Sequence, residues 1–439
     1  MANQNRPRLR SPSRGLAPVT AIVQNERAID GKDSYRVRFD LKRDIKFHFN
    51  GPLGPHGPDA ETSDLLDIAL SVMFVERDLR KLALTNRVTR ITITVPVREP
   101  RRWASRRSTL EEILRFMGGH DWQLEFAKSS LPLREANEQA KEEKKLVVLH
   151  SGGMDSACGL GSLMAKRRSV QLVSFYTNQR PIQEQIATEL AFAPPSQLYA
   201  TWRDKTSRRG RGAFAYRSFL FLSLAALVAR SFGASSILQF ENGFMAASVP
   251  PCANYFVTRH AHPKYHRLFN ELLGQMSLSV AVGNPFRWKT KRQAVLEFRG
   301  AVGARKANLI LAKTQSCWFY SYHQFHSRFK RERIEKKPHQ HCGLCVPCLV
   351  RRAAFRDQDY SLDPRRPPAG VRDKANVSYN YDAYLAFCRW VLSNAQTPEG
   401  LRRALLQFGI ILDPEAGPWD SLRPLLVQFS REFIAAFKR

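Results

Sequence analysis

Long apolar runs are absent from this 439-residue sequence. No stretch of 18 or more apolar residues occurs, which argues against a membrane-spanning helix. The first residues, MANQNRPRLRSPSRG, are basic, but no apolar segment follows them as it would in a secretory signal. We therefore expect residues 1–17 to form a disordered basic arm, and the protein to be cytoplasmic with no membrane partner.

Acidic residues are scarce relative to basic ones. The sequence holds 39 Asp and Glu against 69 Lys and Arg, which gives a formal net charge of +30 and a pI near 10.3. This balance favours an anionic partner, such as nucleotide phosphates, nucleic acid or an acidic protein, and says nothing about the fold. Nucleic acid stays an open possibility as a partner, although no nucleic-acid-binding motif accompanies the charge. At a usual domain size of about 100 to 200 residues, two or three domains are expected.

The N-terminal part, residues 18–130, is predicted to be an α+β accessory domain. Strand patterns occur at 18–24, 34–40, 45–49, 90–97 and 122–126, and helical patterns at 64–84 and 108–117. The next segment, residues 131–144, is polar and nearly free of large apolar side chains. It is predicted to be a linker.

In the following part, residues 145–360, strands and helices alternate. Strands are predicted at 145–149, 169–176, 196–202 and 235–240, and helices at 155–166, 181–192 and 216–233. This alternation predicts an α/β domain with a parallel sheet covered by helices on both faces. Three further helical patterns predict that residues 375–439 form a small helical extension.

A glycine turn follows the first strand of the α/β domain, in LVVLHSGGMDS. Gly152 and Gly153 let the backbone turn tightly and approach a ligand. The N–H groups of the turn and of the helix that follows would bind an anion. Ser151 and Ser156 can donate to phosphate oxygens, and Asp155 can orient the turn or help to hold Mg²⁺. The simpler alternative is a strand-to-helix turn in which Asp155 or Ser156 caps the helix.

The Walker pattern GxxxxGK[ST] is missing. The run SGGMDS instead resembles the signature of the N-type ATP pyrophosphatases, or PP-loop enzymes. This resemblance implies a HUP-like fold in which ATP is split between its α- and β-phosphates, so that AMP is transferred to a substrate oxygen. The ATP-binding residues that it implies are Leu149, His150, Ser151, Gly152, Gly153, Met154, Asp155 and Ser156.

Seven cysteines are present, an odd number in a chain without a secretory signal, and this points to metal rather than disulfides. Cys342, Cys345 and Cys348 stand at two-residue gaps, and Cys317 lies upstream in TQSCW. Four thiolates suit tetrahedral Zn²⁺. An iron–sulfur cluster takes the same ligands and is the rival interpretation.

Several single residues near these motifs have a structural explanation. His339 and His341 flank the cysteine cluster and would be ligands only in a Cys₃His site that lacks the upstream cysteine. His262 and His266 form an i,i+4 pair, but no HExxH glutamate accompanies them, so a surface or capped helix is expected. Cys158 is expected to pack inside the helix after the glycine turn.

The glycine turn, an arginine at the head of a long apolar helix, and SCW followed by CGLCxxCLVRRAAF together resemble QueC, the 7-cyano-7-deazaguanine synthase family, over about residues 145–358. The resemblance implies that ATP adenylates 7-carboxy-7-deazaguanine, which passes through an amide to the nitrile. It implies ATP, Mg²⁺ and Zn²⁺ as cofactors, catalytic roles for Asp155, Ser156, Arg217 and Lys291, and zinc held by Cys317, Cys342, Cys345 and Cys348.

The sequence departs from this family in several places. Ser218 stands where the family has asparagine, and His150 replaces a small or apolar residue. A long basic insert follows Cys317, and no DYSGYPDCR-like segment for base recognition is found. The added parts and the charge resemble the enlarged QueC-like proteins of antiphage defence clusters, QatC and its counterpart in type IV CBASS. That resemblance implies attachment of a deazaguanine, through an amide, to a protein partner encoded nearby.

Two other functions fit parts of the pattern. A tRNA-modifying PP-loop enzyme suits the basic charge, although the cysteine spacing matches QueC. A non-catalytic nucleotide-binding scaffold of a defence complex suits the missing base-recognition segment. The basic residues at 203–211 form either a solvated loop or a segment that closes over the phosphates of ATP.

Overall fold

The computed structural model describes residues 19–25, 35–41, 45–81, 88–133, 139–175, 179–202, 215–249, 258–318, 340–356, 360–367, 379–395, 397–407 and 419–438. The expected basic arm, the basic loop at 203–211 and His339 lie outside these ranges. Among the helices in the described ranges, none is both long and apolar enough to cross a membrane.

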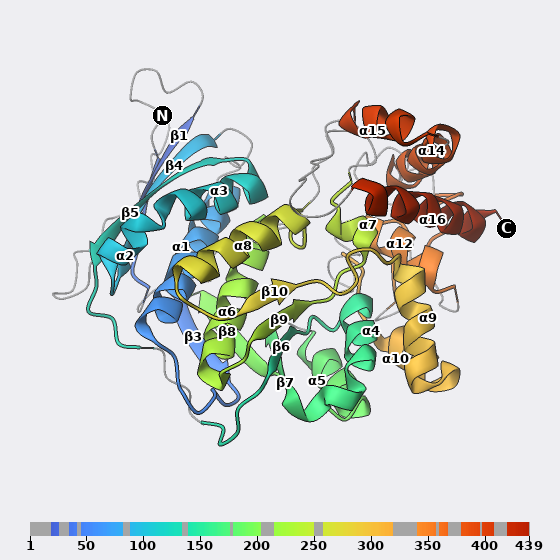
Figure 1. The fold of residues 1–439 in the computed structure, drawn as a ribbon. Coiled ribbons are helices and arrows are strands. Elements are labelled where there is room, and N and C mark those ends of the chain that lie inside the picture. The colour runs from blue at the N-terminus through green and yellow to red at the C-terminus, as the bar shows by residue number, and fades with distance from the viewer. Residues whose placement is uncertain are drawn as a thin grey trace, which may run out of the picture.

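The N-terminal part is built on a four-stranded sheet in the order β2-β1-β4-β5 (Figure 1). Its strands are β1 (Val19–Asn25), β2 (Tyr35–Phe39), β4 (Val88–Val97) and β5 (Asp121–Lys128). Three helices accompany it: α1 (Ala60–Lys81), α2 (Pro100–Ser105) and α3 (Arg107–Gly118). Strands β4 and β5 pair in parallel, which requires a crossover, and α2 and α3 supply it. Along β4, Ile91 and Ile93 are buried while Thr92 pairs with Gln123 on the solvent side, as alternation in a half-exposed sheet requires.

A six-stranded sheet follows, in the order β10-β9-β6-β7-β8-β3. The strands β6 (Leu146–Leu149), β7 (Val170–Phe175), β8 (Ser196–Trp202), β9 (Ser236–Gln239) and β10 (Ala281–Gly283) are all parallel. The chain steps outward from β6 to β8 and then crosses to β9, on the other side of β6. The strand order therefore reverses between β6 and β9, and in open α/β sheets ligands bind outside the carboxyl ends of the strands at such a point.

One edge of this sheet comes from the N-terminal part. Strand β3 (Ile45–Asn50) pairs antiparallel with β8. The sequence pattern groups it with the strands before α1, because alternation reveals that a strand exists but carries no record of its partner.

Helices cover both faces of the six-stranded sheet, and this confirms the expected α/β class. On one face lie α6 (Arg217–Phe232) and α8 (Pro263–Gln275), with Val147 of β6 in their core. On the other lie α4 (Met154–Ser162), α5 (Arg180–Glu189), α9 (Lys291–Val302) and α10 (Ala304–Lys313), with the neighbouring Val148. A short 3₁₀ helix, η2 (Met164–Ser169), joins α4 to β7. Successive β6 residues thus enter opposite cores, as in a strand buried on both faces.

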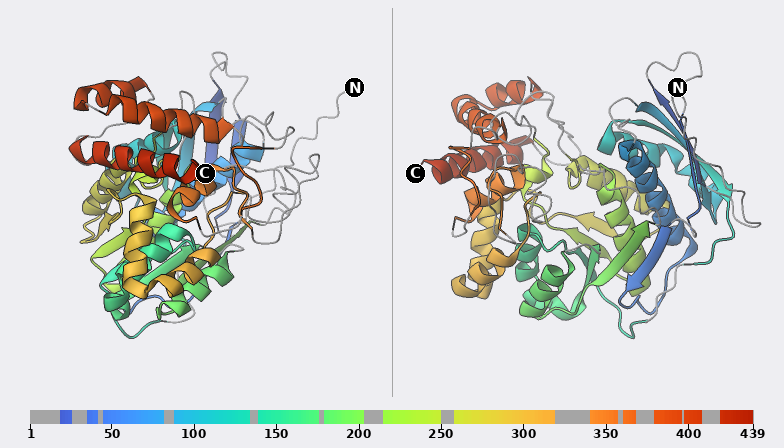
Figure 2. Two further views of the ribbon diagram at one scale, coloured as in Figure 1. Left: turned by 90° about the vertical axis from the view of Figure 1, so that its right-hand side faces the viewer. Right: turned by 180° about the vertical axis from the view of Figure 1, so that it is seen from behind.

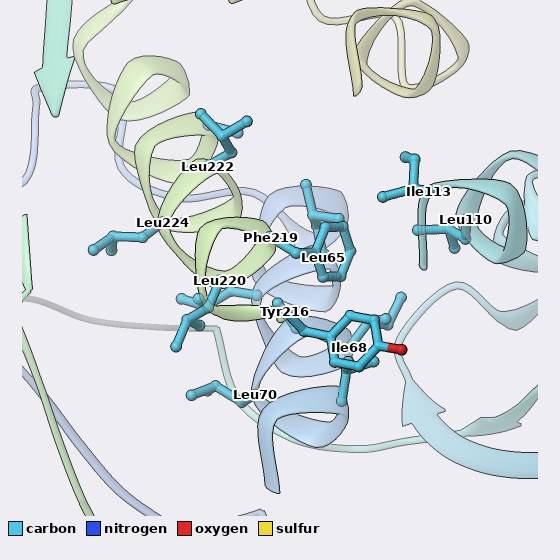
Figure 3. Close-up of a cluster of buried hydrophobic side chains, with 14 of the residues drawn as sticks. Leu65, Ile68, Leu70, Leu110, Ile113, Tyr216, Phe219, Leu220, Leu222 and Leu224 are labelled. Carbon is cyan, nitrogen blue, oxygen red and sulfur yellow. The ribbon is translucent and has the colours of Figure 1, made fainter. Parts of the chain in front are cut away.

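The N-terminal part and the six-stranded sheet share one core. Figure 3 shows Leu65 and Ile68 of α1 beside Phe219 of α6, with Leu110 and Ile113 of α3 nearby. All five side chains are fully buried, and each burial of this size stabilises the fold by about 1.5–3 kcal/mol. Helix α6 is therefore held between the sheet and the N-terminal helices.

The C-terminal part is helical, and the three predicted helical patterns correspond to α14 (Tyr379–Asn394), α15 (Pro398–Gln407) and α16 (Trp419–Phe437). They pack on α12 (Val346–Ala354) and on α7 (Gly243–Ala246), where the Phe244 and Phe429 rings stack 3.6 Å apart. Figure 2 shows these helices on the opposite side of the six-stranded sheet from the N-terminal sheet.

Candidate functional site

The glycine turn lies between the end of β6 and the start of α4, at the reversal of strand order. Gly152 has φ +75°, and a Cβ there would lie 3.1 Å from Cγ of Gln183. The Gly153 N–H donates to Ser151 Oγ at 3.2 Å, and Ser156 Oγ donates to the Gly153 carbonyl at 2.9 Å. The two serine hydroxyls are 3.3 Å apart. Both hydroxyls therefore face the same tight turn, in which the positive φ of residue 152 strongly favours glycine.

Among the residues that the structure describes, no side chain caps α4 at its N-terminus. The N-cap residue is Gly153, Ser156 donates to it rather than accepting, and Asp155 is ion-paired with Lys291 instead. The simpler interpretation, a capped helix, therefore does not describe this turn. The described side chains supply no acceptor to the N–H groups of the first helical turn, and this is the condition under which a helix N-terminus binds an anion.

Asp155 forms the centre of a buried polar cluster. Lys291 Nζ is ion-paired with Asp155 Oδ2, and Asn242 Nδ2 donates to the same oxygen at 3.1 Å. Lys291 is the first residue of α9, whose start is fixed by a capping box between Thr290 and Gln293. Two residues predicted from separate parts of the chain, Asp155 and Lys291, are thus brought together.

Glu241 extends this cluster, and sequence reasoning missed it. Asn242 Nδ2 also donates to Glu241 Oε1 at 2.9 Å, and His260 Nε2 lies 2.8 Å from Oε2. Asn284 holds the Glu241 backbone at both its N–H and its carbonyl, at 3.2 and 2.7 Å. The available signal was position: Glu241 is the second residue after β9, at the carboxyl edge of the sheet beside β6.

The two carboxyl groups differ in their electrostatics. Burial raises the pKa of Asp155; Lys291 opposes this shift, and the nearby Glu241 charge adds to it. For Glu241, burial also favours the neutral form, but His260 and Lys291 outweigh it and hold its pKa below the usual range. A proton entering this pair therefore goes to Asp155, and the negative charge stays on Glu241.

An oxygen-ligand cation fits this pair. Asp155 Oδ1 is buried and has no hydrogen-bond partner among the described residues, and a buried carboxylate oxygen without a partner is costly. Mg²⁺ prefers one or two carboxylates together with phosphate oxygens. Asp155 and Glu241 are the residues that would hold it here.

His150 is buried next to the turn and has a structural role there. Its Nε2 lies 3.0 Å from the Gln183 carbonyl, and Ser174 Oγ donates to the His150 carbonyl at 2.6 Å. Burial lowers the pKa of His150 to about 4, although the Gln183 contact opposes this. The ring is therefore neutral near pH 7 and supplies no positive charge to a phosphate. Its neighbour Leu149 packs partly buried against the core shared with α6, and Met154 is fully buried.

Arg217 begins α6, and the N-terminal part fixes that beginning. Its side chain is exposed and lies 5.7 Å from the Phe221 ring centroid. The Glu76 carboxylate of α1 accepts the Ala215 and Tyr216 N–H groups at 2.7 and 3.3 Å. Glu76 therefore caps α6 from another element of the fold.

The Tyr216 hydroxyl adds a second attachment between the same parts. Trp122 Nε1 of β5 donates to it at 2.8 Å, and His120 Nδ1 lies 2.8 Å away. A Cβ at Gly118 would lie 2.0 Å from this hydroxyl, so only glycine fits beside it. The position of Arg217 thus depends on residues before the α/β domain.

The four cysteines form a buried cluster, with all Sγ atoms within 4.8 Å of one another. Cys342 and Cys348 Sγ are 3.8 Å apart, and Cys345 and Cys317 Sγ are 4.0 Å apart. Tetrahedral zinc with Zn–S bonds of about 2.3 Å requires S–S separations of about 3.8 Å. The cluster therefore fits Zn²⁺. The N–H groups of Cys342 and Cys345 donate to Cys317 and Cys342 Sγ at 3.3 and 3.4 Å, as in thiolate cages.

The cluster and the glycine turn are joined by a short segment. The Gln315 N–H, two residues before Cys317, donates to the Gly152 carbonyl at 3.0 Å. Arg351 of α12 donates to Thr314 Oγ1 at 2.7 Å. His341 Nε2 accepts the Ser316 N–H at 3.3 Å, so His341 supports the segment rather than replacing a cysteine. A metal at this site would hold residues 314–317 against the turn.

The remaining predicted residues have structural roles. His262 is the N-cap of α8 and accepts the Lys264 N–H at 3.1 Å, which confirms a capped helix. His266 is buried and lies 3.0 Å from Gln239 Oε1. Cys158 is buried in α4, and burial raises the pKa of its thiol, which leaves it a packing residue.

Fold and site define an α/β protein with a parallel sheet, a glycine turn where the strand order reverses, and a buried four-cysteine cluster. Residues 211–359 match the family model for the queuosine biosynthesis protein QueC. The matched range holds Arg217, Lys291 and the four cysteines, whereas the glycine turn precedes it. The chain thus carries a QueC family domain over this range.

Proposed function

We propose that the protein is an ATP-dependent C–N ligase or synthase that adenylates a 7-deazaguanine carboxylate. Its six-stranded sheet would be a PP-loop, HUP-like domain, with ATP at the turn from Ser151 to Ser156. The observation that carries this proposal is the turn itself, open at a helix N-terminus and next to the buried Asp155–Lys291 pair. The QueC match over residues 211–359 supports the substrate class.

The described residues suit phosphoryl chemistry, in which positioning and charge neutralisation supply most of the catalysis. The N–H groups of the turn and the Ser151 and Ser156 hydroxyls would bind phosphate oxygens. Lys291 would place a positive charge against them. Mg²⁺, when bound at Asp155 and Glu241, would neutralise charge on the phosphates. Arg217 would bind the acid substrate from the start of α6.

The reaction has two balanced steps. A carboxylate oxygen attacks the α-phosphorus of ATP, the bond between the α-phosphorus and the bridging oxygen breaks, and pyrophosphate leaves. An amine nitrogen then attacks the acyl carbon, the acyl–oxygen bond breaks, and AMP leaves with loss of a proton from nitrogen. The product is an amide; where the amine is ammonia, a second activation would dehydrate this primary amide to a nitrile, whereas an amide to a protein amine is the final product.

We further propose that the protein belongs to the enlarged, defence-associated type and that its amine is supplied by a protein partner. The support is the added N-terminal sheet and C-terminal helices, both of which contact elements at the carboxyl edge of the six-stranded sheet. The net charge of +30 favours a second candidate, a tRNA-modifying enzyme of the same chemistry.

Exchange of labelled pyrophosphate into ATP tests the proposal. We expect exchange that depends on 7-carboxy-7-deazaguanine in the wild type and falls at least about a hundredfold in Lys291→Met, since a buried charge at the phosphates is lost. The matched control is Lys289→Met, because Lys289 is ion-paired with Glu297 at 2.6 Å, outside the cluster. Exchange that requires tRNA instead of the acid would favour the second candidate.

A further inference from the structure

One face of α16 contacts two elements that carry residues of the candidate site. Leu425, Phe429 and Glu432 stand at i, i+4 and i+7 along this helix, so they lie on the same face. All three side chains are buried. Leu425 and Phe429 lie against α7, and Glu432 lies against the start of α9. We call these three residues the α16 face.

Helix α7 has four residues and depends on this face for its position, since so short a helix is not stable alone. The Phe244 ring stacks on Phe429 with the centroids 3.6 Å apart and the planes at 12°. A Cβ at Gly243 would lie 2.7 Å from Leu425 Cδ2. The two helices therefore approach each other so closely that glycine is needed between them.

The position of α7 sets the direction of Asn242, its N-cap. Asn242 Oδ1 accepts the Met245 N–H at 3.2 Å. Because the carbonyl side of the amide is used in this bond, Nδ2 points the other way. There it donates to Asp155 Oδ2 and Glu241 Oε1 at 3.1 and 2.9 Å. Asn242 thus joins the two carboxyl groups only while α7 keeps its place.

Glu432 contacts the residue that precedes Lys291. Gln428 Nε2 donates to Glu432 Oε1 at 2.8 Å. Burial raises the pKa of Glu432, and hydrogen bonds from Gln428 and Thr290 oppose this shift. Thr290 is the N-cap of α9, and its side-chain oxygen already accepts an N–H group of that helix, so its hydroxyl donates to the carboxylate. Glu432 therefore holds the point at which Lys291 leaves the backbone.

We infer that α16 is a positioning element of the candidate ATP site. Phe429 acts through α7 on Asn242, and Glu432 acts through the N-cap of α9 on Lys291. Asn242 and Lys291 both bind Asp155 Oδ2, and the α16 face fixes the two elements that deliver them. That ATP binds there rests on the proposed function; the placement of Lys291 does not.

The reactivity of the Lys291 amine tests this placement without a nucleotide. The full chain is treated with a limiting amount of acetic anhydride, and peptide mass spectrometry compares acetylation of Lys291 with that of the exposed Lys306 of α10. In the wild type the Lys291 amine is buried and ion-paired. We expect its relative labelling to rise at least about threefold in Glu432→Ala, since local opening exposes the amine. Glu432→Gln retains an acceptor for the N-cap hydroxyl and should label as the wild type does.

Nucleotide affinity tests both halves of the α16 face. The full chain is titrated calorimetrically, with Mg²⁺, using an ATP analogue that has a methylene bridge between the α- and β-phosphates. We expect Kd to rise at least about fivefold in Phe429→Leu and in Glu432→Ala, because small displacements of binding groups are costly. The matched control is Phe437→Leu on the same helix, whose ring lies 5.1 Å from that of Tyr381. It should lower the unfolding temperature and leave Kd unchanged, whereas a merely structural role would treat the three variants alike.

Unchanged Lys291 labelling in Glu432→Ala, or equal Kd in the wild type and both variants of the α16 face, would overturn the inference. If Glu432→Ala does not fold, Glu432→Met fills the same space without an acceptor and gives the same comparison with Glu432→Gln. A wild type that binds no nucleotide, with Lys291 labelling that still follows residue 432, would contradict the proposed function and leave the positioning role of α16 standing.

Discussion

At the scale of single residues, the site depends on groups whose charge is set by burial. Asp155, Glu241 and His150 all lie near the carboxyl ends of β6 and β9, yet their pKa values shift differently: burial raises that of Asp155 and lowers that of His150, whereas His260 and Lys291 lower that of Glu241. Asp155 and Lys291 were predicted from sequence because each belongs to a recognisable motif. Glu241 was not, since a glutamate after a short strand has no distinctive neighbours and becomes a site residue only when the sheet brings β9 beside β6.

The decrease of pyrophosphate exchange at low pH should depend on Glu241. Its negative charge raises the pKa of Asp155, so the neutral variant Glu241→Gln should lower that pKa. A cation at the phosphate site needs Asp155 ionised, so pyrophosphate exchange should rise with pH as Asp155 loses its proton. In Glu241→Gln this rise should occur at lower pH. The maximum rate should fall in this variant. pH profiles of the two proteins measure this. Coincident midpoints would show that the two carboxyl groups are not coupled.

The stability of the fold should depend on pH through His150. Its pKa in the folded protein, about 4, lies below its ordinary value of 6.5. The neutral buried ring therefore contributes fully to the free energy of unfolding above pH 6.5, and this contribution is lost as the pH falls toward 4. His150→Gln has no proton to gain and should lose roughly 1–3 kcal/mol less stability over that window. Urea unfolding at pH 7 and pH 5 measures the difference. Equal losses of stability between pH 7 and pH 5 in the two proteins would show that His150 does not carry this dependence.

Among the elements, α6 is fixed by residues of the N-terminal part. Glu76 caps it from α1, and the Tyr216 hydroxyl contacts β5. The length and end of α6 were evident in the sequence, because an apolar run ends at Gly233, which has φ +67°. Its cap was not, because Glu76 precedes it by 139 residues and no local pattern records a contact at that separation.

Removal of this cap should destabilise the protein. We expect Glu76→Ala to cost about 1–2 kcal/mol, since the N–H groups of Ala215 and Tyr216, the two residues just before α6, lose their acceptor. Glu76→Gln should recover part of the loss because it retains one acceptor oxygen. Thermal unfolding of both variants gives the comparison. If Arg217 binds substrate, the KM for the acid should rise in Glu76→Ala while ATP binding stays the same, and a uniform loss of both would argue for a purely structural cap.

In the whole molecule, both added parts contact the carboxyl edge of the six-stranded sheet. The N-terminal part reaches it at the start of α6, and the C-terminal helices reach it at α7 through Phe244 and Phe429. Periodic patterns in the sequence predicted the strands and helices of both parts except the short α2. Their packing against the sheet was not predicted, and β3 shows the limit most clearly: its alternation is plain, but its partner β8 follows it by some 150 residues.

Metal removal should affect the molecule as a whole, because the cysteine cluster holds residues 314–317 against the glycine turn. Chelation at neutral pH should release about one Zn²⁺ per chain, lower the unfolding temperature and weaken ATP binding, since the Gln315–Gly152 contact loses its support. Elemental analysis, thermal unfolding and nucleotide titration measure these three effects. Iron with acid-labile sulfide in place of zinc would contradict the assignment of the metal.

The central claim is that ATP is cleaved between its α- and β-phosphates at the turn from Ser151 to Ser156. The most direct measurement is the identity of the products, resolved by chromatography of labelled ATP after incubation with 7-carboxy-7-deazaguanine, Mg²⁺ and an amine. We expect AMP and pyrophosphate in equal amounts, both abolished in Asp155→Ala. ADP with inorganic phosphate, or no acid-dependent product from wild-type protein, would contradict it.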